Sequence, residues 1–554
     1  MTGGNGPTSV GPHSNGQHSI SPHANGPHAN GQHSNSTSPP GAAGRPGAAG
    51  RHVVVIGGGL AGITAAIRLR EAGAAVTLLE ARPRLGGATC SFSRGDLQID
   101  NGQHVFLRCC TAYQDLLARL GMTGSVTIQD RFDVTVLTPD RQARLRRSGL
   151  PAPLHLTGSL ARYALLTPAE RIRAGRAALG LRFADPASPA LDDQRLGDWL
   201  ARRWQGERAR RRLWDLFIIS ALNIAGDDAS VSLAATVIKT ALLGRNDAAD
   251  IGIPAIPLGD LHGQSAQRLL ARLGADVRLA AKAAAIEPPA RPGDPFRVIL
   301  ARPAPAATSP DAATSPDAAS PSSDENELTI ADSADGPVQP DNASFLQADA
   351  VVLAVPAAAA AGLAPAPLAA RAAEWAGLGA SPIVNVHVRY DRRVTRLPFA
   401  AALESPVQWV FDKTRAAGVT SGQYLAVSLS AADDYVDVPA ARLREQFLPA
   451  LAAIFPAAAD ARVLDCFVTR ERRATFRQVP GTGRLRPGTG TAVPGLALAG
   501  AWTETGWPDT MEGAVRSGQN AAEHIMSELA ALGAAEPARD QRVKPDGIAA
   551  RASS

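Results

Sequence analysis

Apolar and polar positions follow two patterns along this chain. Residues 52–59, HVVVIGGG, and 74–81, AAVTLLEA, have the run of apolar side chains expected of buried strands, and residues 62–72 between them have helical spacing. A continuous apolar run, ADAVVLAVP at 348–356, is typical of a strand buried on both faces in a parallel sheet. Residues 496–500, LALAG, repeat this pattern near the end of the chain. This interleaving of strands and helices predicts an α/β fold.

The intervening regions have other patterns. Residues 151–250 are largely helical with an Arg-rich face, whereas residues 381–438 alternate as strands do. Because 554 residues exceed what one core holds, we expect two domains. We predict a Rossmann-type dinucleotide-binding domain built from discontinuous segments, with an inserted α+β domain that binds substrate and contacts a membrane. The first comprises residues 51–150, 262–300, 346–380 and 462–530, and the second residues 151–261 and 381–461.

Three segments lack apolar residues to bury. Residues 1–50 are a low-complexity tail rich in Gly, Pro, Asn, Ser and His, and residues 302–345 are an acidic insertion that contains ATSPDA twice. We predict that both are disordered and that residues 534–554 form a flexible tail. Histidines recur every five residues from His13 to His33, a spacing that suits either metal binding or, more simply, a solvated tail.

Charge and cysteine content indicate the partners and the cellular compartment to expect. The net charge is +5, although residues 302–345 hold eight acids and one Arg, so the folded part is more basic than the whole. A basic body favours an anionic partner such as a membrane surface or a diphosphate, or it reflects an Arg-rich composition alone. Four cysteines fit no disulfide framework and no zinc spacing, so we expect a reducing compartment and no metal. No signal peptide or spanning segment is visible, which predicts a cytoplasmic protein held peripherally on the inner face of the membrane, with no nucleic-acid partner.

A dinucleotide fingerprint lies at the first strand. Gly57, Gly59 and Gly62 form G-x-G-x-x-G between that strand and the following helix. Gly57 permits the turn, Gly59 lets the backbone approach a diphosphate at the helix N-terminus, and Gly62 allows the helix to pack closely on the strand. Glu80 ends the second strand, where its carboxylate can accept hydrogen bonds from the adenosine ribose. Together these features predict a bound dinucleotide.

A second element distinguishes FAD from NAD. Arg84, Gly86 and Gly87 form R-x-G-G soon after Glu80, and this resembles the flavin amine oxidase and phytoene desaturase superfamily. The chain has no second G-x-G-x-x-G motif, so we expect no separate NADPH-binding domain. The resemblance implies that FAD is the cofactor and extends to the stretch LALAGAWTETGWPDTMEGAVRSG. It implies further cofactor contacts at Val277, Gly500, Ala501, Gly513, Ala514 and Val515, with a helix beginning near Val515 that faces the flavin.

Ala501 departs from the superfamily pattern. The resemblance implies Asp or Glu at this position, where the acid holds the ribityl chain of the flavin. Loss of one charge-assisted hydrogen bond costs about 1.5–3 kcal/mol, which a site with many contacts tolerates. We therefore predict a flavin site with weakened ribityl anchoring, and Glu504 is a more distant substitute.

Further motifs narrow the resemblance. DNGQH at 100–104, RERRATFRQVPG at 470–481, Arg486-Pro487 and WTETGWPDTMEGAVRSG resemble the squalene-associated FAD-dependent desaturases, the hydroxysqualene dehydroxylases. The resemblance implies reduction of an allylic C30 alcohol to squalene in isoprenoid or hopanoid biosynthesis. It also implies a hydrophobic C30 partner and association with other enzymes of the squalene pathway. An acid protonates the hydroxyl, water leaves, and hydride from reduced FAD quenches the cation.

Four residues in these motifs are candidate acids: Asp100, His104, Asp509 and Glu512. Each has a structural alternative, since Asp100 suits a turn, His104 a backbone hydrogen bond and Glu512 a helix cap. Three apolar segments are candidates for the walls of a substrate tunnel, or for an ordinary core: residues 213–226, 231–244 and 251–261. The arginines between Arg202 and Arg212 flank the first of them, as expected of a membrane-facing entrance.

The residues alone do not exclude three other functions. A carotenoid desaturase would share the fold and move hydride in the opposite direction. An amine oxidase or protoporphyrinogen oxidase would share the cofactor, and Trp502 and Trp507 would suit an aromatic cage. A flavin-binding protein without catalysis would account for Ala501.

Overall fold

A five-stranded parallel sheet gathers strands from distant parts of the chain. Its order is β10 (Asp276–Arg278), β2 (Ala75–Leu79), β1 (His52–Ile56), β15 (Ala350–Leu353) and β21 (Leu496–Leu498). Every neighbouring pair is parallel. The α/β fold class is therefore confirmed, and each strand that we predicted around the fingerprint and in the two apolar runs belongs to this sheet.

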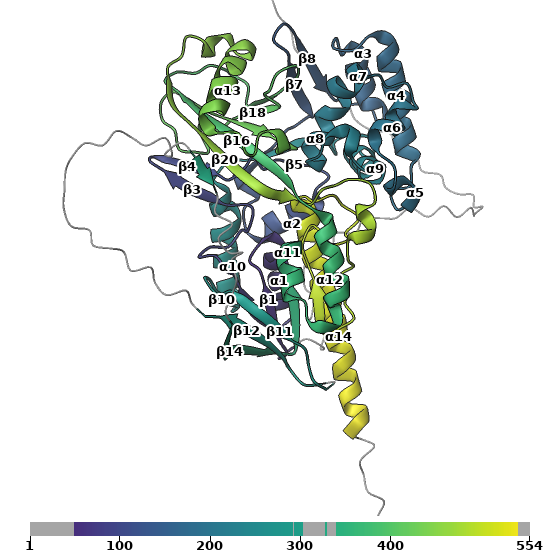
Figure 1. Cartoon of the computed structure of the whole chain (residues 1–554), viewed down its shortest axis with the longest axis vertical. Helices are drawn as coiled ribbons and strands as arrows, with labels where there is room; N and C mark the ends of the chain where they lie inside the picture. The colour runs from purple at the N-terminus through teal and green to yellow at the C-terminus, as the bar shows by residue number, and fades with distance from the viewer. Residues whose placement is uncertain (1–48, 292, 303–326, 330–339, 541–554) are drawn as a thin grey trace, which may run out of the picture. The chain divides into compact units, whose positions relative to one another are not determined.

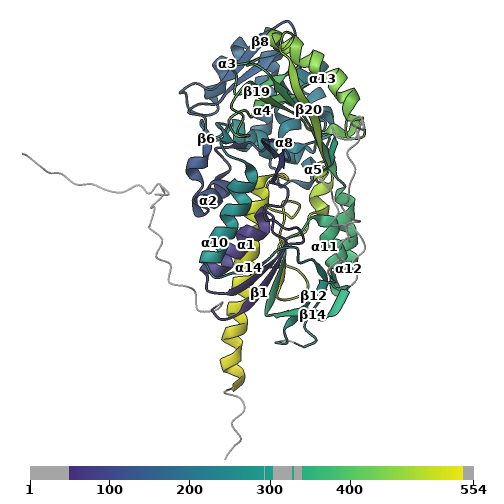
Figure 2. The same ribbon diagram turned by 90° about the vertical axis from the view of Figure 1, so that its left-hand side faces the viewer.

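Both faces of this sheet are covered, which explains why its strands are apolar throughout. Val53 and Val55 face a core formed with α1 (Leu60–Glu71), α10 (Ser265–Arg272) and α14 (Met511–Asp540). Val54 and Ile56 point the other way, toward α11 (Ala357–Leu363), α12 (Ala369–Trp375) and a small sheet. That sheet comprises β11 (Ala283–Glu287), β12 (Phe296–Ala301) and β14 (Pro340–Ala348). Figure 2 shows these layers on either side of β1.

An eight-stranded sheet forms the other large element. Its order is β13 (Glu327–Thr329), β20 (Val463–Thr475), β16 (Ser381–Tyr390), β19 (Gln423–Leu429), β18 (Trp409–Asp412), β17 (Phe399–Ala402), β7 (Asp133–Leu137) and β8 (Gln142–Arg146). Helix α13 (Ala440–Ile454) packs on one face, against residues such as Val386 and Val468. The alternate residues of β16 and β20 face the other way, and there Asn385, His387 and Thr469 are fully buried.

Residues 151–250 are largely helical, as predicted. They form α3 (Thr157–Arg162), α4 (Pro168–Phe183), α5 (Pro189–Asp192), α6 (Leu196–Ala201), α7 (Glu207–Ala209), α8 (Asp215–Leu222) and α9 (Val231–Val237) (Figure 1). Their buried side chains form one core with β7 and β17. The segment 251–261 begins instead as β9 (Ile251–Pro254), which pairs with β5 (Phe106–Leu107) and β6 (Val126–Ile128). A hairpin of β3 (Ser91–Arg94) and β4 (Leu97–Asp100), followed by α2 (Thr111–Arg119), precedes this region.

The computed structural model describes residues 49–291, 293–302, 327–329 and 340–540. The predicted tail 1–50 lies outside this part except for its last two residues. Within the predicted acidic insertion 302–345, β13 pairs with β20, and the first residues of β14 pair with β12, so disorder is a wrong prediction for these strands. Helix α14 begins at Met511, one turn before the predicted Val515, and continues to Asp540, into the predicted tail 534–554. The domain boundaries themselves stay predictions.

Candidate functional site

Two of the three fingerprint glycines, Gly57 and Gly62, occupy positions that have no room for a side chain, whereas Gly59 has room for one. Gly57 has φ +108°, and a Cβ there would lie 2.3 Å from the Ala354 carbonyl oxygen. A Cβ on Gly62 would lie 1.8 Å from the Gly57 carbonyl oxygen, so α1 packs directly on the turn. Around Gly59 the nearest atom to such a Cβ is the Gly87 Cα, 3.9 Å away. The turn thus brings bare backbone to the C-terminal edge of the sheet, where ligands bind in folds of this kind.

The R-x-G-G loop closes over this turn. The Gly86 N–H donates to the Gly58 carbonyl over 2.9 Å, and Arg84 donates to the Gly87 carbonyl over 3.1 Å. The Glu80 carboxylate accepts the Gly58 N–H over 2.6 Å and the Arg82 N–H over 2.8 Å. The Glu80 carboxylate therefore holds the glycine turn in shape, in addition to its predicted contact with the adenosine ribose. Val277, on β10, pairs in register with Leu78 at the same edge of the sheet.

The N-terminus of α1 is open to an anion. Its N-cap residue is Gly59, which has no side chain, and no acidic residue lies in the first turn. The first N–H groups of a helix have no partner within the helix, and with the helix dipole they favour negative charge. The glycine-lined approach and the uncapped helix together fit the diphosphate of FAD.

The C-terminal motif forms the second part of the predicted cofactor site. Gly500 follows β21 with φ +141°, and its N–H donates to Ser517 Oγ over 2.8 Å. In the first turns of α14, Gly513 has no room for a side chain because a Cβ would lie 2.6 Å from the Pro508 carbonyl oxygen, and Val515 is fully buried. The Ala514 N–H donates to the Thr510 carbonyl. Gly518 lets α14 approach the Ala61 carbonyl of α1, which brings the two flavin motifs together.

Ala501 directs its side chain toward this helix. A Cβ built on Gly513 would lie 3.6 Å from that of Ala501. The buried Arg486 guanidinium donates to the carbonyls of Ala501 over 3.2 Å and Trp507 over 2.9 Å, so it holds the loop in shape. Glu504, the substitute acid that we considered, is 47% exposed, accepts the Gly506 N–H over 2.7 Å and lies 3.5 Å from Arg486. Its carboxylate is thus engaged within its own loop.

Asp509 lies between the N-terminus of α14 and the helical region. Its carboxylate accepts the Phe476 N–H over 2.8 Å, and its own N–H donates to Gln478 Oε1 over 3.2 Å. The Gln478 amide also donates to the Leu222 carbonyl at the end of α8 over 2.7 Å. Burial raises the pKa of Asp509 to about 6, against the opposing effects of the Phe476 N–H and Arg486. This carboxyl therefore holds a proton in part of the population near neutrality.

Asp100 is held by three donors at the end of β4. Lys413 Nζ lies 2.9 Å from one carboxylate oxygen, and both side chains are almost fully buried. Ser91 Oγ and the Leu258 N–H donate to the other oxygen over 2.6 and 2.9 Å. These three contacts occupy both oxygens of the Asp100 carboxyl group and hold the end of β4 in place.

His104 lies beside this pair and is half-buried. Its Nδ1 is 3.2 Å from the Gly102 carbonyl oxygen, an arrangement in which Nδ1–H donates. Desolvation is the largest cause that lowers the His104 pKa, although the Gly102 carbonyl and Asp100 oppose it. The imidazole is therefore neutral at neutral pH.

The polar face of β16 and β20 adjoins these residues. The Asn385 amide donates to the Asn101 carbonyl over 3.3 Å, while its buried Oδ1 has no hydrogen-bond partner among the described residues. His387 Nδ1 lies 2.7 Å from Tyr424 Oη and its Nε2 3.0 Å from Thr469 Oγ1. His262 contacts Tyr113 Oη through Nε2 over 2.7 Å, and its buried Nδ1 has no partner in the part of the chain that the structure describes. Sequence reasoning missed Lys413 and this face, although Asn and His at alternate positions of an apolar strand are a signal of it.

Glu512 is bound on three sides. Its carboxylate accepts the N–H groups of Ala112 over 3.2 Å and Tyr113 over 2.8 Å, at the start of α2. Arg516, one turn further along α14, donates to it over 2.7 Å. The carboxylate thus caps α2 and ties it to α14.

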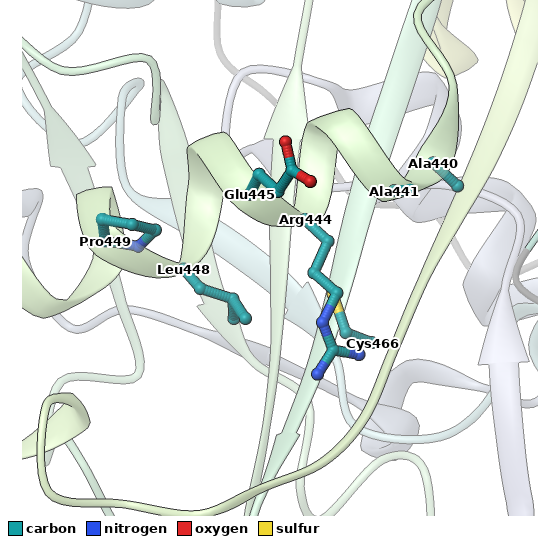
Figure 3. Close-up of a pocket in the computed structure, with 7 residues that line it drawn as sticks. All are labelled: Ala440, Ala441, Arg444, Glu445, Leu448, Pro449 and Cys466. Atoms are coloured by element: carbon teal, nitrogen blue, oxygen red, sulfur yellow. The ribbon is translucent and has the colours of Figure 1, made fainter.

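A separate hollow of about 430 Å³ lies between α13 and β20, on the face of the sheet opposite Asn385 and His387. Figure 3 shows Arg444 extending from α13 toward Cys466. Burial is the main cause that raises the Cys466 pKa to about 11, so this thiol is protonated and poorly nucleophilic. None of the residues that line this hollow belongs to the predicted cofactor site.

Of the three apolar segments that we considered as tunnel walls, residues 213–226 and 231–244 contribute most of their large side chains to the helical core, and residues 251–261 divide theirs between that core and the core around α1 and α10. Leu213, Trp214, Ile218 and Leu222 of the first are buried there, and Phe217 is partly exposed. Within the described residues, no helix is both long and apolar enough to cross a membrane.

Comparison with known proteins agrees with this geometry. The model of the family "Flavin containing amine oxidoreductase" matches residues 60–301 and 321–526. The chain belongs to this family. It is an FAD-dependent oxidoreductase, and the resemblance to hydroxysqualene dehydroxylases is confirmed by its relatives.

Two of these relatives are matched over nearly their whole length. The hydroxysqualene dehydroxylase of Rhodopseudomonas palustris is 30% identical over 484 residues, which cover 86% of this chain and 99% of the relative. That of Sinorhizobium fredii is 29% identical with the same coverage. A 15-cis-phytoene desaturase of Narcissus pseudonarcissus is 24% identical, over 87% of this chain and 80% of the relative. A solved putrescine oxidase shares the fold, with a TM-score of 0.60 and 18% identity over 86% of this chain and 99% of that one.

Proposed function

We propose that this enzyme converts hydroxysqualene to squalene by reductive dehydroxylation, a step of isoprenoid and hopanoid biosynthesis. Two relatives that bear the name hydroxysqualene dehydroxylase match it over 99% of their length. The structural observation that carries the proposal is Asp509, a carboxyl with a pKa raised to about 6 in the loop that enters the flavin-facing helix.

The reaction needs a proton donor at the leaving hydroxyl. A general acid works best when its pKa is near the operating pH, and burial is the usual way to raise a carboxyl to that range. Asp509 meets this requirement. Both oxygens of Asp100 and of Glu512 are already engaged by a basic side chain and by other donors of the protein, and desolvation lowers the pKa of His104.

Each remaining candidate has a supporting role in this proposal. The Asp100–Lys413 pair fixes the end of β4, and with it the turn that carries His104. The neutral His104 and the buried Asn385 amide orient the hydroxyl group. Glu512 positions α2 against α14.

The cofactor supplies the electrons. The glycine turn, the R-x-G-G loop and the N-terminus of α14 would hold FAD, which in its reduced form would supply the hydride that replaces the hydroxyl group. In balance, the alcohol takes up one proton and one hydride and releases squalene and water. Asp509 supplies the proton to the oxygen, and the apolar surroundings keep water from trapping the allylic cation.

The test is an anaerobic incubation of the photoreduced enzyme with hydroxysqualene, followed by product analysis. Squalene formed with reoxidation of one flavin supports the proposal. Phytoene desaturases match this chain at lower identity, so the oxidised enzyme is tested with squalene and phytoene in parallel. New double bonds with flavin reduction, and no dehydroxylation, would favour a desaturase.

A further inference from the structure

Helix α4 faces three of its four larger apolar side chains outward. Ile172 is 68% exposed, Leu179 43% and Phe183 81%, whereas the helix buries Ala174, Ala177 and one large side chain, Leu181. Positions 172, 179 and 183 recur at seven and four residues and therefore lie on one face of the helix. A helix that only covered its own core would have the opposite arrangement.

Neighbouring segments extend this apolar surface. Leu154, 52% exposed, lies just before α3, whose Leu160 contacts α4 near Gly175. Trp204 is 71% exposed and follows Arg203, whose side chain packs beside Gly180 of α4. Of the ten large apolar residues exposed among the described ones, six lie between residues 150 and 204. The described surface therefore concentrates its exposed apolar side chains here.

The same surface is basic. Arg162, Arg173 and Arg176 are exposed on α3 and α4, and none forms an ion pair with any residue that the structure describes. Residues 157–183 hold five arginines and a single acid, Glu170, whose carboxylate caps α4 and binds Arg208. Arginine side chains can lay their apolar stems along a greasy surface while the guanidinium groups reach anions.

We propose that the outer face of α3 and α4, with Trp204, docks on an anionic lipid bilayer. An apolar helix face flanked by Arg and accompanied by an exposed Trp is the chemistry of a helix that lies in the membrane interface. The choice of a bilayer over another apolar partner rests in part on the proposed function, since a C30 substrate resides in lipid. The segment differs from the one that sequence analysis favoured, because residues 213–226 are mostly buried.

Vesicle binding by the FAD-loaded full-length protein tests this proposal without any activity assay. Vesicles of phosphatidylcholine alone are compared with vesicles containing phosphatidylglycerol. Ile172→Ser with Phe183→Ser is expected to reduce binding to the anionic vesicles at least tenfold. Arg173→Glu with Arg176→Glu is expected to remove the preference for anionic lipid, and high salt should do the same to the wild type.

Matched variants elsewhere provide the controls. Leu464→Ser with Leu532→Ser removes two other exposed apolar side chains. Arg268→Glu with Arg272→Glu makes the same charge change on α10. Each control should bind as the wild type does, and all variants should keep their FAD and melting temperature. Equal losses in the control and α4 variants would overturn the proposal.

Trp204 offers a direct probe of insertion. It is the most exposed of the seven tryptophans; four of the other six are buried, and Trp409 and Trp507 are partly exposed. Lipids brominated near the headgroup should quench fluorescence in the wild type, and Trp204→Phe should lose most of that quenching. A lipid-free dimer that Phe183→Ser dissociates, with no vesicle binding by the wild type, would show that a second copy covers this face instead. Failure of dehydroxylation with normal vesicle binding would reject only the proposed reaction.

Discussion

Lys413 Nζ lies 2.9 Å from Asp100 Oδ2, and both side chains are more than nine-tenths buried. Removal of one partner from such a pair leaves an uncompensated charge in the interior. Lys413→Met is therefore expected to destabilise the protein by about 3–5 kcal/mol, measured by urea unfolding of the FAD-loaded enzyme. The double variant Asp100→Asn with Lys413→Met should regain much of this loss. Equal stability of single and double variants would show that the two charges are not coupled.

Asp509 should control the pH dependence of the reaction. Because its pKa is about 6, the protonated fraction falls as pH rises through that value, and the single-turnover rate should fall with it. Asp509→Asn cannot donate the proton, so its rate should be lower by about 10²–10⁴ and nearly independent of pH. Stopped-flow measurement of flavin reoxidation over pH 5 to 9 gives both profiles.

Stability gives an independent readout for the same residue. A carboxyl with a raised folded-state pKa binds its proton more tightly in the folded protein, so its ionisation destabilises the fold as pH rises through about 6. Asp509→Asn should therefore be the more stable protein above pH 6, and the difference should shrink toward pH 4. A variant that is inactive and destabilised at every pH would indicate a structural role instead.

Ala501→Asp should tighten FAD binding. The side chain at position 501 points toward the first turn of α14, where an acid can reach the ribityl chain. We expect a gain of about 1–2 kcal/mol, or roughly five- to thirtyfold in dissociation constant, with little change of turnover at saturating FAD. Glu504→Gln is the matched control, because that carboxylate is engaged by Gly506 and Arg486. Unchanged affinity in Ala501→Asp would mean that another group already satisfies the ribityl hydroxyls.

Glu512→Gln should affect stability more than chemistry. The amide keeps an acceptor for the α2 N-terminus but loses the charge that pairs with Arg516 and with the helix dipole. We expect a loss of about 1–2 kcal/mol in unfolding free energy and a single-turnover rate within a fewfold of wild type. A rate loss of a hundredfold with unchanged stability would restore Glu512 as the acid.

The cofactor site was predictable from sequence because its signals are local. Gly57, Gly59 and Gly62 lie directly after one strand, and Glu80 ends the next strand. The spacing of these residues in the sequence is therefore enough to recognise the motif. The β-strands that complete the sheet, β15 and β21, were visible because burial on both faces makes a strand apolar throughout.

The rest of the site depends on contacts between distant segments. Asn385 and His387 alternate with valines, a pattern typical of a sheet with one solvated face, yet that face is buried against β4 and the residues that follow it. Lys413 follows a short strand with no motif around it, and its only sequence signal is that it is one of four lysines among 56 basic residues. The raised pKa of Asp509 follows from burial, which spacing does not reveal.

The most direct test of the central claim is an anaerobic single turnover of the reduced enzyme with hydroxysqualene, run with the wild type, Asp509→Asn and His104→Ala. The account predicts that the wild type forms one squalene per flavin reoxidised, that Asp509→Asn retains reduced FAD without forming squalene on the same timescale, and that His104→Ala slows the reaction without changing its pH profile. Squalene formation at the wild-type rate by Asp509→Asn, or no squalene from the wild type, would contradict it.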